Sequence, residues 1–258
     1  MNYILGANGF IGQHLQKKVK CVAIPHQKIN TTAIEPFDNL FYLASYGNLI
    51  HQTDIKETIK ANTLDVAKII DQAVQHDFKS FVFISTSSVK LRIQTAYSRA
   101  KRAAEEILLA YLERYNKPIC IIRPFSVTGV GEQAEHLIPK LIHSCVTGEQ
   151  MNFVGHPTHD FIDVDDLVSG IINLSQHSAR GVFELGTGKS YSNDQVLEIV
   201  EKVTGKKANI NRVESLRKYD NENWVSTNYR SRSFGWTPQK TLEVSIKEMY
   251  ESLKKTNT

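Results

Sequence analysis

The chain has 258 residues, of which 41% are hydrophobic and 22% are charged, and its formal net charge is +4. This length and apolar content predict a globular protein with one sizeable α/β body and a smaller appended lobe. The charge is mild and no basic tract is interleaved with aromatics, which argues against nucleic acid as a partner. No apolar run approaches the roughly 18–20 residues needed to cross a bilayer, so no membrane insertion is expected.

The three cysteines, Cys21, Cys120 and Cys145, are odd in number and far apart in the sequence. Because Cys21 and Cys120 lie in apolar, strand-like runs, we expect buried thiols rather than disulfides or zinc ligands. The histidines show no metal-ligand spacing, and no metal is assigned. Residues 1–12 predict a strand and a glycine-rich turn rather than a signal peptide, so we expect a cytoplasmic protein.

Residues 2–5 are a short apolar run, and three glycines spaced by three, Gly6, Gly9 and Gly12, lead into an amphipathic segment at 10–19. The pattern predicts a strand, a tight turn and a helix start. Glycines there permit positive φ and let backbone N–H groups approach a pyrophosphate, whose negative charge suits a helix N-terminus. We therefore expect this turn to contact a dinucleotide. The expected residues are Gly6, Asn8, Gly9, Phe10, Ile11 and Gly12.

Strand-like runs at 2–5, 21–24, 39–44, 81–85 and 118–122 alternate with helical patterns at 10–19, 54–76 and 96–115. Such alternation predicts an α/β protein with a Rossmann-type, doubly wound parallel sheet and right-handed crossovers. After Pro124 the predicted elements are shorter: a helix near 134–147, a strand near 151–154, a helix at 163–176, a strand at 182–185 and a helix at 192–204. We expect an NAD(P)-binding domain over 1–125 and a mainly substrate-binding α/β lobe over 126–258, with some elements returning to the sheet.

Tyr97 and Lys101 stand four residues apart in the helix predicted at 96–115, so both side chains lie on one face within reach of a shared ligand. An ammonium beside a phenol favours the phenolate, which would bring proton exchange by Tyr97 from its ordinary pKa near ~10 toward neutral pH. The same spacing occurs on many solvated helices. The pair therefore indicates catalysis only together with the other motifs of the chain.

Together, Gly6-x-x-Gly9-x-x-Gly12 and Tyr97-x-x-x-Lys101 resemble the extended short-chain dehydrogenase/reductase family, in particular its NAD-dependent epimerase/dehydratase type, nucleotide-sugar branch. The resemblance runs nearly end to end, and so many matches in the family's order make chance implausible. The further matching segments are 41–45, 61–66, 81–89, 123–129, 160–166, 184–188 and 234–238.

The resemblance implies that Thr86 supplies a hydroxyl to the substrate oxygen at the carbon that gains or loses hydride, with Ser87 as the fallback. It also implies that Tyr97 exchanges the proton, while Lys101 bonds the nicotinamide ribose and lowers the pKa of Tyr97. Asn62, in the helix predicted at 54–76, is implied to serve the cofactor site, although it could simply be a surface residue. The other implied cofactor contacts are Leu43, Ala44, Ser45, Ser85 and Pro124.

Two departures from the family pattern limit the reactions that we expect this chain to catalyse. Where dehydratases carry an Asp-Glu pair after the Thr, this chain has Ser87-Ser88, and serines cannot supply an acid and a base at neutral pH. Dehydratase activity is therefore not expected. Only eleven positions separate Thr86 from Tyr97, so the loop at the rim of the active site is shorter than is usual in the family. A shorter loop favours a ketoreductase, which releases its product after one hydride transfer, over an epimerase.

On the substrate side, Ser126 stands where the family has Asn, and His159 stands where it has Arg. Both usual residues contact the nucleotide diphosphate or the sugar. A protonated His can still bind phosphate, but its pKa near ~6.5 makes the contact pH dependent. Arg212 and Arg217 could supply a permanent charge or could be solvated surface residues, and we take Arg212 as the expected substrate contact.

The choice of cofactor depends on the residues after the second predicted strand. In this fold an acidic residue about 20 positions past the first glycine bonds the ribose hydroxyls of NAD. Residues 21–28 contain no carboxylate, and His26 and Lys28 could pair with a 2′-phosphate. NADP is therefore expected in preference to NAD.

The sequence thus predicts an NAD(P)-dependent oxidoreductase acting on a nucleotide-activated sugar, with a 4-ketoreductase of a nucleotide-linked 4-keto-6-deoxysugar as the first choice. A nucleotide sugar, with two negative charges, is compatible with the net charge of +4. Two alternatives stay open: a nucleotide-sugar 4-epimerase with tightly bound NAD, and a redox-silent NADP-binding regulator. The resemblance implies a homodimer, formed through the helices at 54–76 and 96–115 of each subunit.

Overall fold

The computed structural model describes residues 1–25, 34–49, 51–214 and 224–256. Its centre is a six-stranded sheet in the order β10-β5-β4-β3-β1-β2, and every neighbouring pair is parallel. The strands are β1 (Asn2–Leu5), β2 (Val22–Ile24), β3 (Asn39–Tyr42), β4 (Ser80–Ile84), β5 (Ile119–Pro124) and β10 (Gly181–Leu185). The prediction of a Rossmann-type parallel sheet is confirmed.

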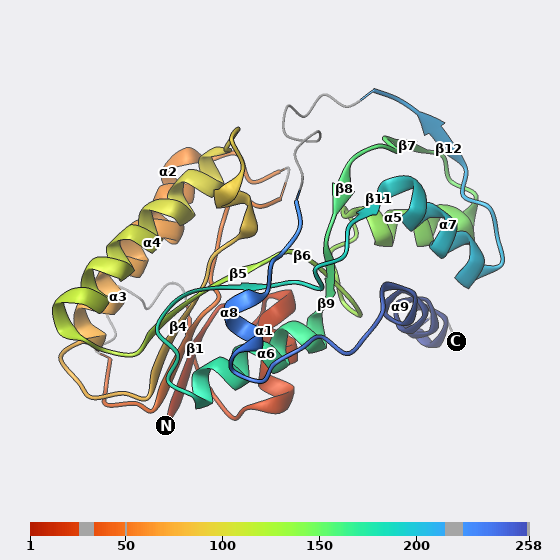
Figure 1. Cartoon of the computed structure of the whole chain (residues 1–258). Helices are drawn as coiled ribbons and strands as arrows, with labels where there is room; N and C mark the ends of the chain where they lie inside the picture. The colour runs from red at the N-terminus through yellow and green to blue at the C-terminus, as the bar shows by residue number, and fades with distance from the viewer. Residues whose placement is uncertain (26–33, 50, 215–223, 257–258) are drawn as a thin grey trace.

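Helices cover both faces of this sheet (Figure 1). On one face α4 (Ala96–Tyr115) packs beside α2 (Ile55–Ile59), the π-helical turn η2 (Lys60–Leu64) and α3 (Asp65–Ala73). On the other face α1 (Phe10–Lys18) contacts α6 (Val164–Gln176). Neighbouring residues of one strand belong to different apolar clusters, as Phe81 and Val82 do, so both faces are buried, as parallel sheets require.

A second group of elements forms a smaller lobe beside the sheet (Figure 1). Three helices, α5 (Leu137–Thr147), α7 (Asn193–Thr204) and α9 (Leu242–Thr256), surround a third apolar cluster. Three short strand pairs accompany them: β6 (Ser126–Thr128) with β9 (Phe161–Asp163), β7 (Met151–Phe153) with β12 (Ile210–Arg212), and β8 (Thr158–His159) with β11 (Tyr191–Ser192). A short helix, α8 (Tyr229–Arg232), contacts β10.

The observed elements differ from the predicted ones in two main respects. The helix predicted at 54–76 consists of three consecutive segments, because the π-helical turn η2 interrupts the regular α-helix. β7 matches the strand predicted near 151–154, but the other short strands of the small lobe were not predicted, since strands of two or three residues carry little periodicity. β10 pairs with β5, and α6 contacts β4 and β5. The domain boundary after residue 125 therefore stays a proposal.

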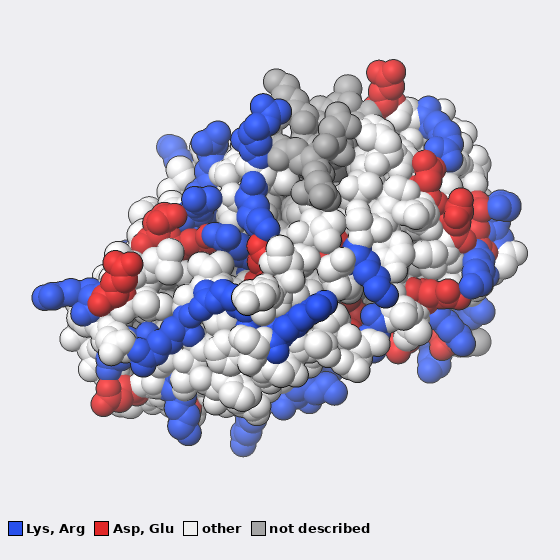
Figure 2. All heavy atoms as spheres, in the orientation of Figure 1, with Lys and Arg blue, Asp and Glu red and all other residues white. Residues whose placement is uncertain are grey.

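The surface and the cysteines bear on what else the chain could bind. All three cysteines are free, and Cys120 and Cys145 are buried, but the expectation was wrong for Cys21, which is half-buried next to the edge strand β2. Within the described ranges, no three His, Cys, Asp or Glu residues gather to hold a metal ion, and no helix is long and apolar enough to cross a membrane. Figure 2 shows acidic side chains interspersed with Lys and Arg on the face in view.

Candidate active site

The glycine-rich turn between β1 and α1 leaves no room for side chains at two of its positions. Gly6 has φ +86°, and a Cβ there would lie 2.6 Å from the Ala44 backbone nitrogen. A Cβ at Gly12 would lie 2.2 Å from the Gly6 carbonyl oxygen. Gly9 is the N-cap of α1 and provides no side chain to bond the first N–H groups of the helix. The turn therefore fits a phosphate group, which the free N–H groups and the helix N-terminus favour.

The turn lies where the order of strands reverses. From β1 the chain first adds β2 on one side and then β3 on the other side of β1. The carboxyl ends of β1 and β3 are therefore the switch point at which open α/β sheets bind ligands. Leu43 continues β3 past its last ladder residue, since its N–H donates to the Leu5 carbonyl at 2.9 Å. Leu43 and Ala44 thus lie against the glycine turn, as expected of cofactor contacts.

The helix α4 carries three site residues on one face. It begins with a capping box, in which the Thr95 side chain accepts from Ser98 N (3.2 Å) and the Ser98 side chain accepts from Thr95 N (2.9 Å). This start places Tyr97 in the first turn. Lys101 and Glu105 follow at intervals of four, on the same face of the helix.

Tyr97 is joined to the end of β3. The Ser45 hydroxyl hydrogen-bonds the Tyr97 phenol and favours its ionised form, but burial raises the pKa of Tyr97 to about 12. The predicted lowering of this pKa by Lys101 is therefore not observed: the Lys101 Nζ lies 6.0 Å from the centroid of the Tyr97 ring, and burial outweighs the hydrogen bond. At neutral pH the phenol holds its proton, which suits a proton donor.

Lys101 is 1% exposed, and its Nζ donates to the Ile84 carbonyl at the end of β4, at 2.8 Å. The same nitrogen lies 4.6 Å from the centroid of the Phe83 ring. Burial lowers the pKa of Lys101 to about 7, and the negative charge of Glu105 opposes this shift. The Lys101 side chain therefore changes between ammonium and neutral amine near neutral pH.

Glu105 is a site residue that the sequence reasoning missed. It is 1% exposed and accepts hydrogen bonds from Arg123 in β5, with Nη2–Oε2 at 2.5 Å and Nε–Oε1 at 2.9 Å. It also accepts a hydrogen bond from Ser85, which follows β4. Its signal in the sequence was the interval of four from Lys101. Through these bonds Glu105 ties α4 to the ends of β4 and β5, beside Pro124.

Thr86 directly follows Ser85 and starts the 3₁₀ turn η3 (Ser87–Lys90). Its Oγ1 accepts from Ser88 N at 3.2 Å and lies 3.0 Å from Ser88 Oγ, so Ser88 holds the hydroxyl in place. Ser87 Oγ accepts a hydrogen bond of 2.8 Å from the indole nitrogen of Trp224, a residue that the sequence reasoning also missed. The predicted hydroxyls thus stand at the end of β4, next to the carbonyl that Lys101 bonds.

Asn62 is fully buried in the π-helical turn η2, so the alternative of a surface residue was wrong. Its Nδ2 donates to the Tyr46 carbonyl (2.6 Å) and the Thr58 carbonyl (2.8 Å). Within the described residues, its buried Oδ1 accepts no hydrogen bond. The side chain therefore supports the segment after β3 that carries Ser45, and it offers one open acceptor.

The predicted substrate residues are spread over the small lobe. Ser126 begins β6, and its N–H donates to the Asp160 carbonyl at 2.9 Å. The His159 ring lies 5.4 Å from the Trp224 ring, between centroids. Arg212, which is 59% exposed, pairs with Asp194 at 2.8 Å and not with the residues around Thr86. The predicted His26, Lys28 and Arg217 lie outside the described residues.

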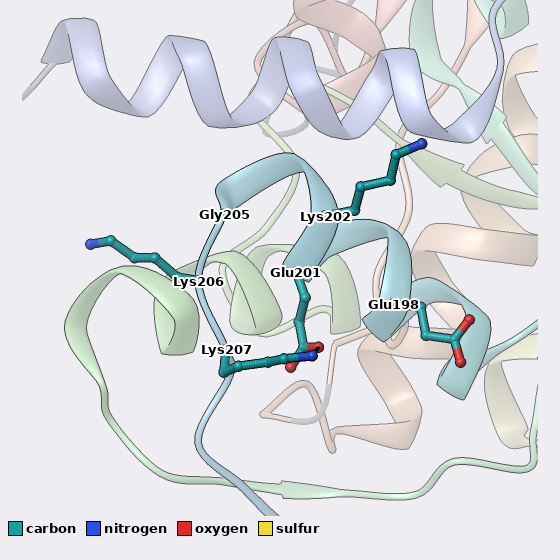
Figure 3. Close-up of a pocket in the computed structure, with 6 residues that line it drawn as sticks. All are labelled: Glu198, Glu201, Lys202, Gly205, Lys206 and Lys207. Atoms are coloured by element: carbon teal, nitrogen blue, oxygen red, sulfur yellow. Dashed lines mark hydrogen bonds and ion pairs between the residues drawn. The ribbon is translucent and has the colours of Figure 1, made fainter.

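A hollow of about 400 Å³ lies on the small lobe, away from these residues. Figure 3 shows that its walls come from the end of α7 and the segment after it. Lys207 pairs there with Glu201. The lining residues are Glu198, Glu201, Lys202, Gly205, Lys206 and Lys207. None of them is a predicted site residue, so the hollow is not part of the candidate active site.

Comparisons with known proteins agree with this geometry. A model of the NAD dependent epimerase/dehydratase family matches residues 2–186. The chain is 27% identical over 218 residues to CDP-abequose synthase of Salmonella muenchen, covering 79% of this chain and 72% of that protein. It is 23% identical over 246 residues to UDP-glucuronate 4-epimerase of Thermodesulfobacterium geofontis (strain OPF15), covering 85% of this chain and 76% of that protein.

The fold also matches solved structures. The chain aligns with MoeE5 in complex with UDP-glucose and NAD at a TM-score of 0.90 and 22% identity, covering 100% of this chain and 99% of that one. The parallel sheet, the glycine turn at its switch point and the family match over most of the length lead to one conclusion. The chain is an enzyme that belongs to the NAD dependent epimerase/dehydratase family, of the extended short-chain dehydrogenase/reductase type.

Proposed function

We propose that this enzyme is an NAD(P)-dependent oxidoreductase that reduces C4 of a nucleotide-linked 4-keto-6-deoxysugar. One observation carries the proposal: Thr86, Tyr97 and Lys101 converge at the carboxyl ends of β3 and β4, next to the glycine turn. Ser45 bonds Tyr97, and Lys101 bonds the Ile84 carbonyl two residues before Thr86. Ala44, beside Ser45, packs on Gly6. A hydroxyl, a phenol and an ammonium are thus gathered where a dinucleotide would end.

The three side chains have complementary roles in this proposal. When bound, the nicotinamide supplies the hydride. Thr86 orients the keto oxygen by a hydrogen bond, and Tyr97, whose raised pKa of about 12 keeps the phenol protonated, gives its proton to that oxygen as negative charge develops. Lys101 holds the ribose hydroxyls of the nucleotide.

NADP as the preferred cofactor is a proposal that rests on composition alone. Residues 21–28 hold no carboxylate that would repel a 2′-phosphate, and His26 and Lys28 could bond it. The measurement is the affinity of the enzyme for NADPH and for NADH under the same conditions. Tighter binding of NADH would overturn this part of the proposal without touching the rest.

The substrate contacts are proposed for Thr86, Ser87, Ser126 and His159. Ser87 and His159 both contact Trp224, which supports a shared site for these two. Arg212 is a weaker member of the set, because Asp194 already neutralises it. Replacing Arg212 by Ala should therefore change KM less than replacing His159 by Ala.

A nucleotide-sugar 4-epimerase with tightly bound NAD is the second candidate. The similarity to a UDP-glucuronate 4-epimerase over 85% of the chain favours it. A redox-silent NADP-binding regulator would keep the fold but not the turnover. The retained Thr86, Tyr97 and Lys101 argue against such a loss.

The deciding experiment follows NADPH absorbance with a panel of nucleotide-linked 4-keto-6-deoxysugars, with the Tyr97→Phe protein as the blank. Oxidation that depends on one keto sugar supports the reductase. If NADPH binds but no sugar is reduced, the reductase proposal fails for that panel. Nucleotide that co-purifies with the protein, together with conversion of a 4-hydroxy sugar, would identify the epimerase instead.

The proposal includes a cytoplasmic homodimer. Ile55, Ile59 and Leu64 are 58%, 45% and 53% exposed on α2 and η2, beside α4, as expected of a helical face that a second subunit covers. Sedimentation of the parent and of Ile59→Glu tests the assembly. A dimer that becomes a monomer on substitution supports it, and a parent that sediments as a monomer contradicts it.

A further inference from the structure

Trp224 lies where the chain returns from the small lobe toward the parallel sheet, between β12 and α8. Its indole nitrogen donates to Ser87 Oγ at 2.8 Å, and its ring lies 5.4 Å from the His159 ring, with 55° between the planes. Ser87 directly follows Thr86. Trp224 therefore joins two candidate substrate residues that belong to different parts of the fold.

The backbone of Trp224 is held as firmly as its side chain. The Trp224 carbonyl accepts from Asp160 N at 3.2 Å, and two residues later Ser226 N donates to the Asp160 carboxylate at 3.0 Å. This carboxylate is buried and also accepts from Thr187 N (2.7 Å) and Gly188 N (2.9 Å). Because Asp160 is itself fixed, the indole is held beside Ser87 by more than its own hydrogen bond.

The bond to Trp224 sets the direction of the Ser87 hydroxyl. An indole N–H can only donate, so the Ser87 oxygen must accept and its proton must point elsewhere. That proton is then available to a second acceptor. A sugar presents such acceptors, and its C–H faces pack well on an aromatic ring that is apolar in its body and polar at one edge.

We propose that Trp224 contacts the sugar of the bound substrate: its ring packs on the pyranose, and its N–H holds Ser87 as a hydrogen-bond donor to a sugar oxygen. This inference rests on the proposed function in one respect, namely that the substrate is a nucleotide-linked sugar. It adds a residue and a contact that the family motifs in the sequence did not indicate.

Fluorescence offers a direct test, because the chain has two tryptophans. Trp236 is 4% exposed and donates to Ser169 Oγ at 2.9 Å in the core under α6, away from Ser87. The Trp236→Phe protein thus reports on Trp224 alone. Should that variant fold poorly, the parent spectrum minus that of Trp224→Phe gives the same signal.

The titration uses UDP-, dTDP-, CDP- and GDP-linked hexoses and the matching free nucleoside diphosphates, with calorimetry in parallel. We expect the sugar nucleotide that binds to shift or quench the Trp224 emission more than its free diphosphate does. Calorimetric binding of a sugar nucleotide with no more change in emission than its diphosphate gives would overturn the inference and leave the proposed function standing. If no sugar nucleotide binds, the proposed function fails and the inference fails with it.

Kinetics separate the ring from the N–H. Trp224→Leu, which removes both, should raise KM for the sugar nucleotide by about 10-fold with little change in kcat, since a lost packing contact weakens ground state and transition state alike. Trp224→Phe keeps a ring and should match Ser87→Ala, and the double variant should be no worse than either single one. Independent, multiplying effects of Trp224→Phe and Ser87→Ala would overturn the role assigned to the N–H.

Discussion

The two ends of the candidate site are built in different ways. The cofactor end is made of parallel strand ends and one long helix, and its residues recur at fixed intervals: Gly6, Gly9 and Gly12 in the turn, then Tyr97 and Lys101 in α4. The substrate end is made of strands of two or three residues and of connecting segments held by side-chain hydrogen bonds. At the cofactor end the local sequence sets the geometry. At the substrate end only the folded chain does.

The largest effect is expected for Tyr97→Phe, at the cofactor end. Loss of the phenol proton should lower turnover by about 10²–10⁴-fold, while nucleotide binding changes little, because the ring that packs on the site remains. The measurement is NAD(P)H oxidation beside nucleotide affinity. Tyr115→Phe, near the end of the same helix and 43% exposed at Tyr115, is the matched control and should keep full activity. Equal losses in both variants would contradict the assignment of Tyr97.

Glu105→Gln should have the next largest effect, on the free energy of unfolding. Removing one partner of a buried ion pair leaves Arg123 without the carboxylate that it hydrogen-bonds, and this costs about 3–5 kcal/mol. Glu106→Gln is the control one position away, because Glu106 is 63% exposed and its pair with Arg102 should contribute only about 0.3–0.5 kcal/mol. Denaturant unfolding of the two variants measures the difference, and similar midpoints would show that Glu105 does not tie the helix to the strands.

Gly12→Ala and Gly9→Ala test how closely the backbone packs around the glycine turn. The new Cβ would meet the Gly6 carbonyl oxygen at 2.2 Å in the first variant and at 3.3 Å in the second. We expect Gly12→Ala to destabilise the fold by about 1–3 kcal/mol and to weaken nucleotide binding, because backbone has to move. Gly9→Ala should cost less than about 1 kcal/mol. Thermal unfolding with and without NADPH checks both, and the reverse order of effects would be unexpected for this geometry.

The same contrast explains what the sequence could and could not predict. Tyr97 and Lys101 were found because an interval of four on a helix is already a spatial relation. Glu105 continues that interval and could have been found in the same way. Trp224 could not, since its partner Ser87 lies 137 positions away and neither residue belongs to a periodic element. Asp160 belongs to a family motif, yet its hydrogen bonds to Thr187, Gly188 and Ser226 emerge only from the tertiary structure.

Lys101→Met tests how much the buried Lys101 side chain at the cofactor end lowers the free energy of unfolding. The pKa of Lys101 falls from 10.5 to about 7 on burial, so between these values the unfolded chain binds more protons than the folded one, and stability rises with pH. The buried ammonium therefore destabilises the folded protein most below pH 7. Lys101→Met should be more stable than the parent at pH 6, and the gain should shrink by about 1–2 kcal/mol by pH 8.5. Denaturant unfolding at both pH values measures this; a gain that is constant with pH would mean that Lys101 keeps an ordinary pKa, and that the helix positions it at no electrostatic cost.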